Sequence, residues 1–207
     1  MTDKYGPQAE GWSERSYADS AKYLRRRADL IARGLEPGDL VLDLACGDGG
    51  LGDVLLARGL RYHGVDANPA MAAAARARLG DRAKIEQDDL NAFDPGEAVD
   101  ATTVFRAIYY ARDHDAFFAR VGSYTRTKLV FDLNPRQYDV DEMLGRVRAA
   151  GFPRVELRPF LFPQRFPLPF PLDALARAVE QVGALARLAL RYRFTYVVTA
   201  WRRRPAR

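Results

Sequence analysis

Residues 40–52 have the sequence LVLDLACGDGGLG. An apolar run carries the acidic Asp43 near its end, and a glycine-containing turn leads directly into a helical pattern. A short apolar run that is bounded by glycine is typical of a buried parallel strand. Strand, turn and helix together predict an open α/β sheet, which binds its ligand at the carboxyl ends of the strands.

The glycine spacing in this stretch is compatible with two kinds of ligand. Gly47, Gly49 and Gly52 match the G-x-G-x-x-G fingerprint of dinucleotide sites, which is weak evidence by itself. A carboxylate at Asp43 would repel a pyrophosphate at the helix N-terminus. The same charge suits a ligand that carries an ammonium and a sulfonium but no phosphate. We therefore expect S-adenosylmethionine as the cofactor and no measurable affinity for NAD.

Residues 41–49, VLDLACGDG, resemble the first motif of the class I S-adenosylmethionine-dependent methyltransferases, small-molecule enzymes of the methyltransferase-domain 11/25-like type. Ala45 stands where the family usually has glycine, and it is small enough for a tight turn. The resemblance implies an α/β fold with a doubly wound, Rossmann-like sheet of seven strands. It implies the strand order 3-2-1-4-5-7-6 with strand 7 antiparallel, and it covers residues 35–161 and 194–201.

The length of 207 residues predicts one methyltransferase domain over residues 1–207. Residues 1–34 are expected to form an N-terminal helical lid, with Trp12, Tyr17 and Tyr23 as lid residues. Residues 35–161 and 194–201 are expected to form the core sheet and its helices. Residues 162–193, between strands 6 and 7, are a Pro/Phe-rich apolar insertion that is predicted to cap the substrate.

Composition excludes several classes of protein. A single cysteine, Cys46, rules out an internal disulfide framework, and two distant histidines, His63 and His114, make a metal site unexpected. No signal peptide and no membrane-spanning run are apparent, so we expect a cytoplasmic protein. The apolar fraction of 48% and the charged fraction of 29% are ordinary for a globular domain.

The net charge of +5 comes partly from two arginine clusters, Arg25–Arg27 and Arg202–Arg204. Such clusters can bind nucleic acid, but they are more often solvated helix faces and tails. No aromatic residues interleave with them in the pattern of a base-stacking track. We therefore do not expect a nucleic-acid partner.

Two acidic positions are candidates for holding the cofactor. Asp66 ends the second predicted strand, where a carboxylate can accept two ribose hydrogen bonds, although helix capping is an alternative role. The resemblance implies that Asp89 and Leu90 contact the adenine, with Asp88 as the rival and a solvated loop as the alternative. The full cofactor set that we expect is Asp43, Ala45, Gly47, Asp48, Gly49, Asp66, Ala67, Asp89, Leu90, Phe105, Arg106 and Tyr17.

The segment after strand 4 carries the candidate catalytic residues. The Asn/Asp-Pro-Pro-aromatic motif of many amino methyltransferases is missing there, which disfavours methylation of bases and amides. His114 is the first candidate for a general base, with a surface histidine as the alternative interpretation. Tyr109 and Tyr110 are the second candidates, and they could also orient the acceptor.

The insertion alternates proline with large apolar residues and then continues into a predicted helix over 172–192. As a cap, it would favour a hydrophobic small-molecule acceptor. A homodimer through the 172–192 helix is one alternative, and contact with a membrane surface is a less favoured one.

The function that we expect is methyl transfer from S-adenosylmethionine to a small, hydrophobic acceptor through oxygen, nitrogen or carbon, which leaves S-adenosylhomocysteine. Alignment and exclusion of water would supply most of the catalysis. The alternatives are a non-catalytic S-adenosylmethionine-binding partner or regulatory protein, and an RNA or protein methyltransferase.

Overall fold

The computed structural model describes residues 9–162, 167, 169–190 and 195–202. Its centre is a seven-stranded sheet in the order β3-β2-β1-β4-β5-β7-β6, as predicted. The strands are β1 (Leu40–Leu44), β2 (Arg61–Val65), β3 (Lys84–Glu86), β4 (Val99–Val104), β5 (Thr125–Leu133), β6 (Arg154–Pro159) and β7 (Tyr196–Trp201). Strand β7 runs antiparallel to both of its neighbours, which confirms the predicted orientation.

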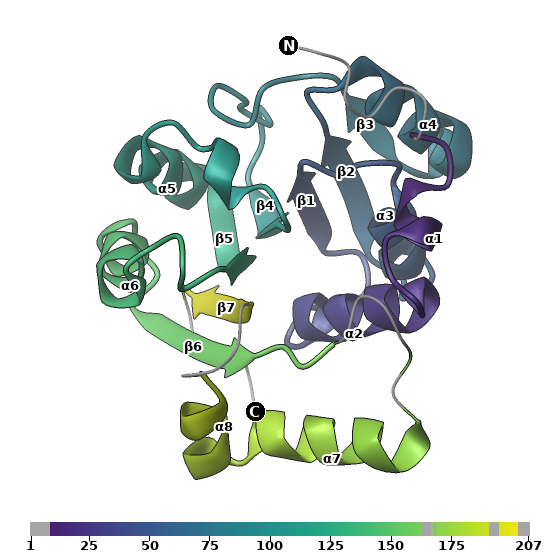
Figure 1. Ribbon diagram of the computed structural model, residues 1–207. Helices are drawn as coiled ribbons and strands as arrows, with labels where there is room; N and C mark the ends of the chain where they lie inside the picture. Colours follow the sequence, from purple (N-terminus) through teal and green to yellow (C-terminus); the bar gives the residue numbers. More distant parts are fainter. Residues whose placement is uncertain (1–8, 163–166, 168, 191–194, 203–207) are drawn as a thin grey trace.

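Helices cover both faces of the sheet (Figure 1). The helical elements are α1 (Trp12–Arg15), α2 (Ser20–Ala32), α3 (Gly50–Leu56), α4 (Pro69–Leu79), η2 (Gly80–Arg82), η3 (Ile108–Tyr110), α5 (His114–Tyr124), α6 (Val140–Ala149), α7 (Phe170–Gln181) and α8 (Gly183–Leu190). Helices α5 and α6 contribute to one hydrophobic core, and α2, α3 and α4 contribute to the other. Leu42 and Leu44 of β1 point to the first core and Val41 to the second, as the alternation of a strand requires.

The order of the strands reverses at β1, which pairs with β2 on one side and with β4 on the other. Both pairings are parallel, so the carboxyl ends of these three strands lie at one edge of the sheet. In open α/β sheets, this switch point is where a ligand binds. The turn after Leu44 lies at that point.

The N-terminal segment, predicted to be helical over residues 1–34, is interrupted between Arg15 and Ser20. It forms two helices, and the longer one, α2, begins only after Asp19, whose carboxylate accepts a hydrogen bond from Lys22 N at 3.0 Å. A local side-chain cap of this kind competes with a continuous helix.

The expected helix over 172–192 is also divided. Val182 has an extended backbone with ψ 107°, and α8 starts at Gly183. Valine and glycine are both weak helix formers, which explains the break. Residues 191 and 192, together with 163–166, 168 and 193–194, lie outside the described part of the chain.

Helix α7 lies beside α2 (Figure 1). The pair Lys22–Asp173 at 2.8 Å and the pair Arg26–Glu180 join these two helices. Large apolar side chains remain exposed on α7, on α8 and between them: Phe170, Leu172, Leu175, Val182, Leu185 and Leu188. The insertion therefore contacts α2 through the acidic residues of α7, and its large apolar side chains are exposed to solvent.

The arginine cluster at Arg25–Arg27 is not a solvated face, contrary to the expectation from sequence. Arg26 and Arg27 are each only 8% exposed, and they pair with Glu180 and Asp132 respectively. Arg25 alone is exposed. Of the second cluster, Arg203 and Arg204 lie outside the described residues. The buried pairs reduce the cationic surface that the sequence suggested.

Within the described ranges, no helix is both long enough and apolar enough to cross a bilayer. The same residues contain no group of three or more His, Cys, Asp or Glu side chains that could hold a metal ion.

Two helical glycines provide a matched test of packing between α5 and α6. A Cβ added at Gly122 would lie 2.2 Å from the carbonyl oxygen of Ala150, whereas one added at Gly145 would meet nothing within 4 Å. We expect Gly122→Ala to lower the free energy of unfolding by about 2 kcal/mol, because the backbone of Ala150 must move. Gly145→Ala should instead raise it by about 0.5–1 kcal/mol.

Urea denaturation of both variants and the parent measures these changes. A Gly122→Ala variant that is as stable as Gly145→Ala would show that α5 and α6 are not in close contact at this point.

Candidate functional site

The turn after β1 has an unusual backbone. Ala45, Gly47 and Gly49 all have positive φ, at 68°, 58° and 77°. The amides of Ala45 and Cys46 both donate to Val65 O, at 2.7 and 2.9 Å, which ties the turn to the end of β2. Alanine pays a steric cost in this region that glycine does not pay, and these two hydrogen bonds offset it.

The later glycines of the motif serve close packing. A Cβ at Gly52 would lie 2.5 Å from Tyr62 Cε1, and one at Gly50 would lie 2.1 Å from Ser13 Oγ. Both positions therefore require glycine for reasons that involve no phosphate. Of the three glycines that match the dinucleotide fingerprint, Gly52 is required by packing, whereas Gly47 and Gly49 have positive φ.

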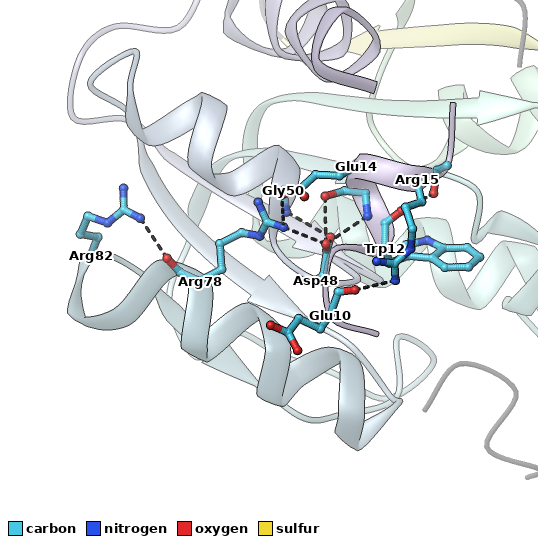
Figure 2. A network of polar contacts seen from close by, with 10 residues as sticks. Glu10, Trp12, Glu14, Arg15, Asp48, Gly50, Arg78 and Arg82 are labelled. Carbon is cyan, nitrogen blue, oxygen red and sulfur yellow. Dashed lines mark hydrogen bonds and ion pairs between the residues drawn. The ribbon is translucent and has the colours of Figure 1, made fainter. Parts of the chain in front are cut away.

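Asp48 fastens the N-terminal segment to the turn. It is 2% exposed, and its Oδ2 accepts hydrogen bonds from Ser13 N at 3.0 Å and Ser13 Oγ at 2.9 Å. Figure 2 shows Arg78 reaching the same carboxylate, at 3.0 Å, and Arg78 also pairs with Glu14 at 2.9 Å. Helix α1 is thus held over the turn, and the indole of Trp12 lies 3.9 Å from where a Cβ of Gly47 would be.

Asp66 lies at the end of β2, next to the turn. Its Oδ2 accepts from Gly47 N at 2.8 Å and its Oδ1 from Asn68 N at 2.9 Å. Burial raises the pKa of Asp66, and these two hydrogen bonds counteract part of that rise. The side chain is half-buried, and each oxygen keeps a second lone pair, so the carboxylate can accept further hydrogen bonds. Ala67, the next residue, is exposed.

Asp89 belongs to a network that joins the loop after β3 to the loop after β4. It accepts from Asn91 N at 2.9 Å and pairs with Arg112 at 2.7 Å. Burial raises the pKa of Asp89, but the hydrogen bonds from Asn91 and the charge of Arg112 lower it by more, so the net shift is downward. Leu90 is buried, and Asp88 is exposed and accepts from Asp89 N at 2.7 Å.

A buried cation lies beside the ends of β4 and β5. The guanidinium of Arg27, from α2, is 4.1 Å from the ring centroid of Tyr23 and 4.0 Å from that of Phe105. It is 3.7 Å from Asp132, the penultimate residue of β5, which also accepts from Arg106 N at 2.7 Å. Burial raises the pKa of Asp132, and the charge of Arg27 opposes this rise.

Tyr17 connects the lid to the insertion. Its ring stacks on Tyr23 with centroids 3.5 Å apart, and the two hydroxyls are 2.6 Å apart. Phe162 meets both rings edge-on, at 5.9 Å from Tyr17 and 5.3 Å from Tyr23. Tyr17 also lies 5.8 Å from the guanidinium carbon of Arg106.

Comparison with known proteins gives a consistent match. The methyltransferase domain family matches residues 41–128. Trans-aconitate 2-methyltransferase of Escherichia coli (strain K12 / DH10B) is 35% identical over 107 residues, which cover 50% of this chain and 42% of that protein. The chain thus matches less than half the length of this curated relative.

Solved structures share the fold. The putative methyltransferase of Haloferax volcanii, in complex with the Trm112 methyltransferase activator, has a TM-score of 0.69 at 20% identity and covers 98% of this chain and 97% of its own. Magnesium protoporphyrin IX methyltransferase of Synechocystis PCC 6803, with bound SAM, has a TM-score of 0.62 at 16% identity and covers 88% and 79%. The family match, the strand order and the turn after β1 agree with one another.

Residues 41–128 thus match the methyltransferase domain family, and the seven-stranded sheet has the strand order of the Rossmann-like methyltransferase fold. The stretch that resembles the family's first motif runs from Val41 to Gly49, and Ala45, which stands where the family usually has glycine, has a positive φ. Asp66 and Asp89 follow the next two strands of the family's sheet.

Asp43 does not face a ligand, although the sequence analysis expected its carboxylate to contact the cofactor. Asp43 is 3% exposed and accepts a hydrogen bond from Tyr62 Oη at 2.6 Å. Burial raises its pKa to about 7, against the opposing effects of the Tyr62 hydrogen bond and the charge of Arg27. A strand buried on both faces has no exposed side, so the argument from repulsion of a pyrophosphate loses its basis at this residue.

The candidate catalytic residues lie beyond β4. Tyr109 and Tyr110 are 49% and 41% exposed, on η3. His114 is the first residue of α5, and its ring lies 5.3 Å from that of Tyr138. Its Nε2 is buried and has no hydrogen-bond partner among the described residues. His114 is therefore half-buried rather than a plain surface histidine.

Sequence reasoning missed Arg27 and Asp132, which the structure brings together near the carboxyl edge of the sheet. Asp132 is the penultimate residue of an apolar strand, as Asp43 is, and Arg27 follows Tyr23 by one helical turn. Those two signals could have suggested that both residues lie at the carboxyl edge of the sheet.

The raised pKa of Asp43 predicts a pH dependence of stability. Between the ordinary value of 3.8 and about 7, the folded state holds a proton that the unfolded state has lost. The free energy of unfolding should therefore fall as pH rises through this window, because the folded state binds more protons. In Asp43→Asn, this fall should be smaller.

Urea denaturation at pH 4, 5, 6 and 7 checks the prediction. Tyr62→Phe removes the hydrogen bond that lowers the pKa of Asp43, and it should move the fall toward higher pH. An unchanged slope in Asp43→Asn would contradict the assignment.

Proposed function

We propose that the chain transfers the methyl group of S-adenosylmethionine to a small molecule. The observation that carries the proposal is the position of the Asp66 carboxylate, which is half-buried at the end of β2 and bonded to Gly47 N in the turn after β1. A carboxylate there can accept hydrogen bonds from the two ribose hydroxyls. Asp89 and the amide of Leu90 would serve the adenine, and Tyr17 would close the site.

The residues at the turn fit this cofactor better than a dinucleotide. The arginine that reaches the turn, Arg78, is occupied by Asp48 and Glu14 and so does not offer its charge to a phosphate. The acidic residues Asp66 and Asp89 suit hydroxyl and amino donors instead. When bound, S-adenosylmethionine supplies a methyl group that is already activated by the sulfonium.

The protein's own contribution is then to position the acceptor and exclude water. The acceptor's lone pair forms the new bond to the methyl carbon, and the electron pair of the broken carbon–sulfur bond stays on sulfur. Any proton that the acceptor loses would go to His114 Nε2 or to solvent, with Tyr109 and Tyr110 as orienting groups. The stacked Tyr17 and Tyr23, with Phe162 against them, would keep water out.

The relatives named above support a small acceptor, since trans-aconitate 2-methyltransferase is named for a small organic acid. The expectation of a hydrophobic acceptor depended on an insertion lying over the substrate. Helix α7 forms two ion pairs with α2, and the insertion contacts Tyr17 of the N-terminal segment through Phe162. We propose that the capping role is limited to Phe162 and its neighbours, while α7 braces α2.

Asp66→Ala should weaken the binding of S-adenosylmethionine at least tenfold. Two hydrogen bonds to a charged acceptor are together worth about 1.5–3 kcal/mol or more. Isothermal titration calorimetry with S-adenosylmethionine measures the loss, and the parent should show no measurable affinity for NAD in the same instrument.

Asp81→Ala is the matched control, because Asp81 is exposed and lies on η2, before β3 begins. It should bind S-adenosylmethionine as the parent does. Equal affinities in Asp66→Ala and Asp81→Ala would rule out the ribose role of Asp66.

No single alanine variant at His114, Tyr109 or Tyr110 should abolish methyl transfer, since alignment and exclusion of water can carry the reaction. Single-turnover rates with labelled S-adenosylmethionine and a metabolite extract test this. A loss beyond about 10⁴-fold at one position would identify that residue as an indispensable base. Binding of the donor with no labelled product would favour the non-catalytic alternative.

A further inference from the structure

Arg106 has a backbone conformation that its side chain does not favour. Its φ is 55°, and the other non-glycine residue with positive φ in the described chain is Ala45 of the first motif. Such a conformation is strained for any residue other than glycine. Glycine would avoid this strain, so an arginine at position 106 needs a reason beyond the fold.

The strained backbone is held by Asp132, which accepts from Arg106 N at 2.7 Å. That bond depends on the amide alone and would survive any side chain except proline. The backbone geometry therefore does not explain the guanidinium. What it does is fix the direction in which the side chain leaves the loop after β4.

The guanidinium of Arg106 forms no close ion pair with a described residue, although its charge helps to lower the pKa of Asp132. Among the described residues, no carboxylate lies within 4.0 Å of this guanidinium, whereas Arg27 faces Asp132 and Arg112 pairs with Asp89. Its contact is with the ring of Tyr17, at 5.8 Å. Arg106 is exposed, and the exposed rings of Tyr109 and Tyr110 follow on the same loop.

These observations concern one place, the carboxyl end of β4 beside the lid. From them we infer that the guanidinium of Arg106, which we expected among the cofactor residues, instead binds a carboxylate of the methyl acceptor. This carboxylate is not the group that receives the methyl. A planar guanidinium pairs with a carboxylate through two parallel hydrogen bonds, and one cation without a close ion pair matches a single negative charge. The inference rests on the proposed function and adds the class of substrate to it.

The experiment uses the full chain with radiolabelled S-adenosylmethionine and a metabolite extract. Labelled product should be retained on an anion-exchange resin, because the anchoring carboxylate survives the reaction. Phosphatase treatment should leave that retention unchanged, which distinguishes a carboxylate from a phosphate ester. Calorimetry with S-adenosylmethionine is run in parallel, so that a failure of donor binding would count against the proposed function and not against Arg106 alone.

Three variants at position 106 separate recognition from structure. Arg106→Gln should lower kcat/KM roughly 10- to 100-fold, mostly through KM, while affinity for S-adenosylmethionine stays unchanged. Arg106→Lys should recover part of the loss, since the charge returns without the fork. Arg106→Gly should lose as much acceptor turnover as Arg106→Gln. Its Tm should stay within about 2 °C of the parent or rise above it, because glycine relieves the backbone strain.

Arg126→Gln is the control. Arg126 is exposed at the start of β5, at the opposite edge of the sheet, and its variant should match the parent in turnover. The inference is overturned by labelled product that the resin does not retain, by parental turnover in Arg106→Gln, or by no labelled product from a protein that binds the donor.

Discussion

The burial of the Arg27 guanidinium is the constraint on which the carboxyl edge of the sheet depends. Burying a charge is costly unless it is paired, and removing one partner of a buried pair leaves the other uncompensated. Arg27 lies between the rings of Tyr23 and Phe105, faces Asp132, and lowers the pKa of the buried Asp43. One side chain of α2 thereby neutralises the ends of β1 and β5. The N-terminal segment is thus part of the core.

The acidic residues of the motif region divide into two groups. Asp43 and Asp48 are buried and hold the protein together, one through Tyr62 and the other through Ser13 and Arg78. Asp66 and Asp89 remain partly exposed with lone pairs available for a ligand. The family motif thus predicts which loop lies at the switch point of the sheet, but it does not predict which nearby carboxylates are exposed to a ligand. Burial and hydrogen bonding make that distinction.

The strand order could be predicted from the family resemblance, and the turn after β1 and the location of Asp66 could be predicted from local periodicity and glycine placement. The sequence was insufficient wherever a partner is distant along the chain. The ion pair between Arg26 and Glu180 joins residues 154 positions apart, and no periodic pattern carries that information. The breaks near Asp19 and Val182 were missed for a different reason, since apolar spacing continues through a local cap or a weak helix former. The role of His114 stays a prediction.

The placement of the two tryptophans gives the protein a built-in optical reporter. Trp12 lies against the turn after β1, on the segment that Asp48 holds, whereas Trp201 is fully buried in β7. If the N-terminal segment lifts, the indole of Trp12 enters water and its fluorescence shifts to the red, while the emission of Trp201 serves as an internal reference. Replacement of Trp201 by phenylalanine would leave Trp12 as the single tryptophan, on the N-terminal segment. Movement of this segment away from the turn after β1 could then be followed by fluorescence without any added label.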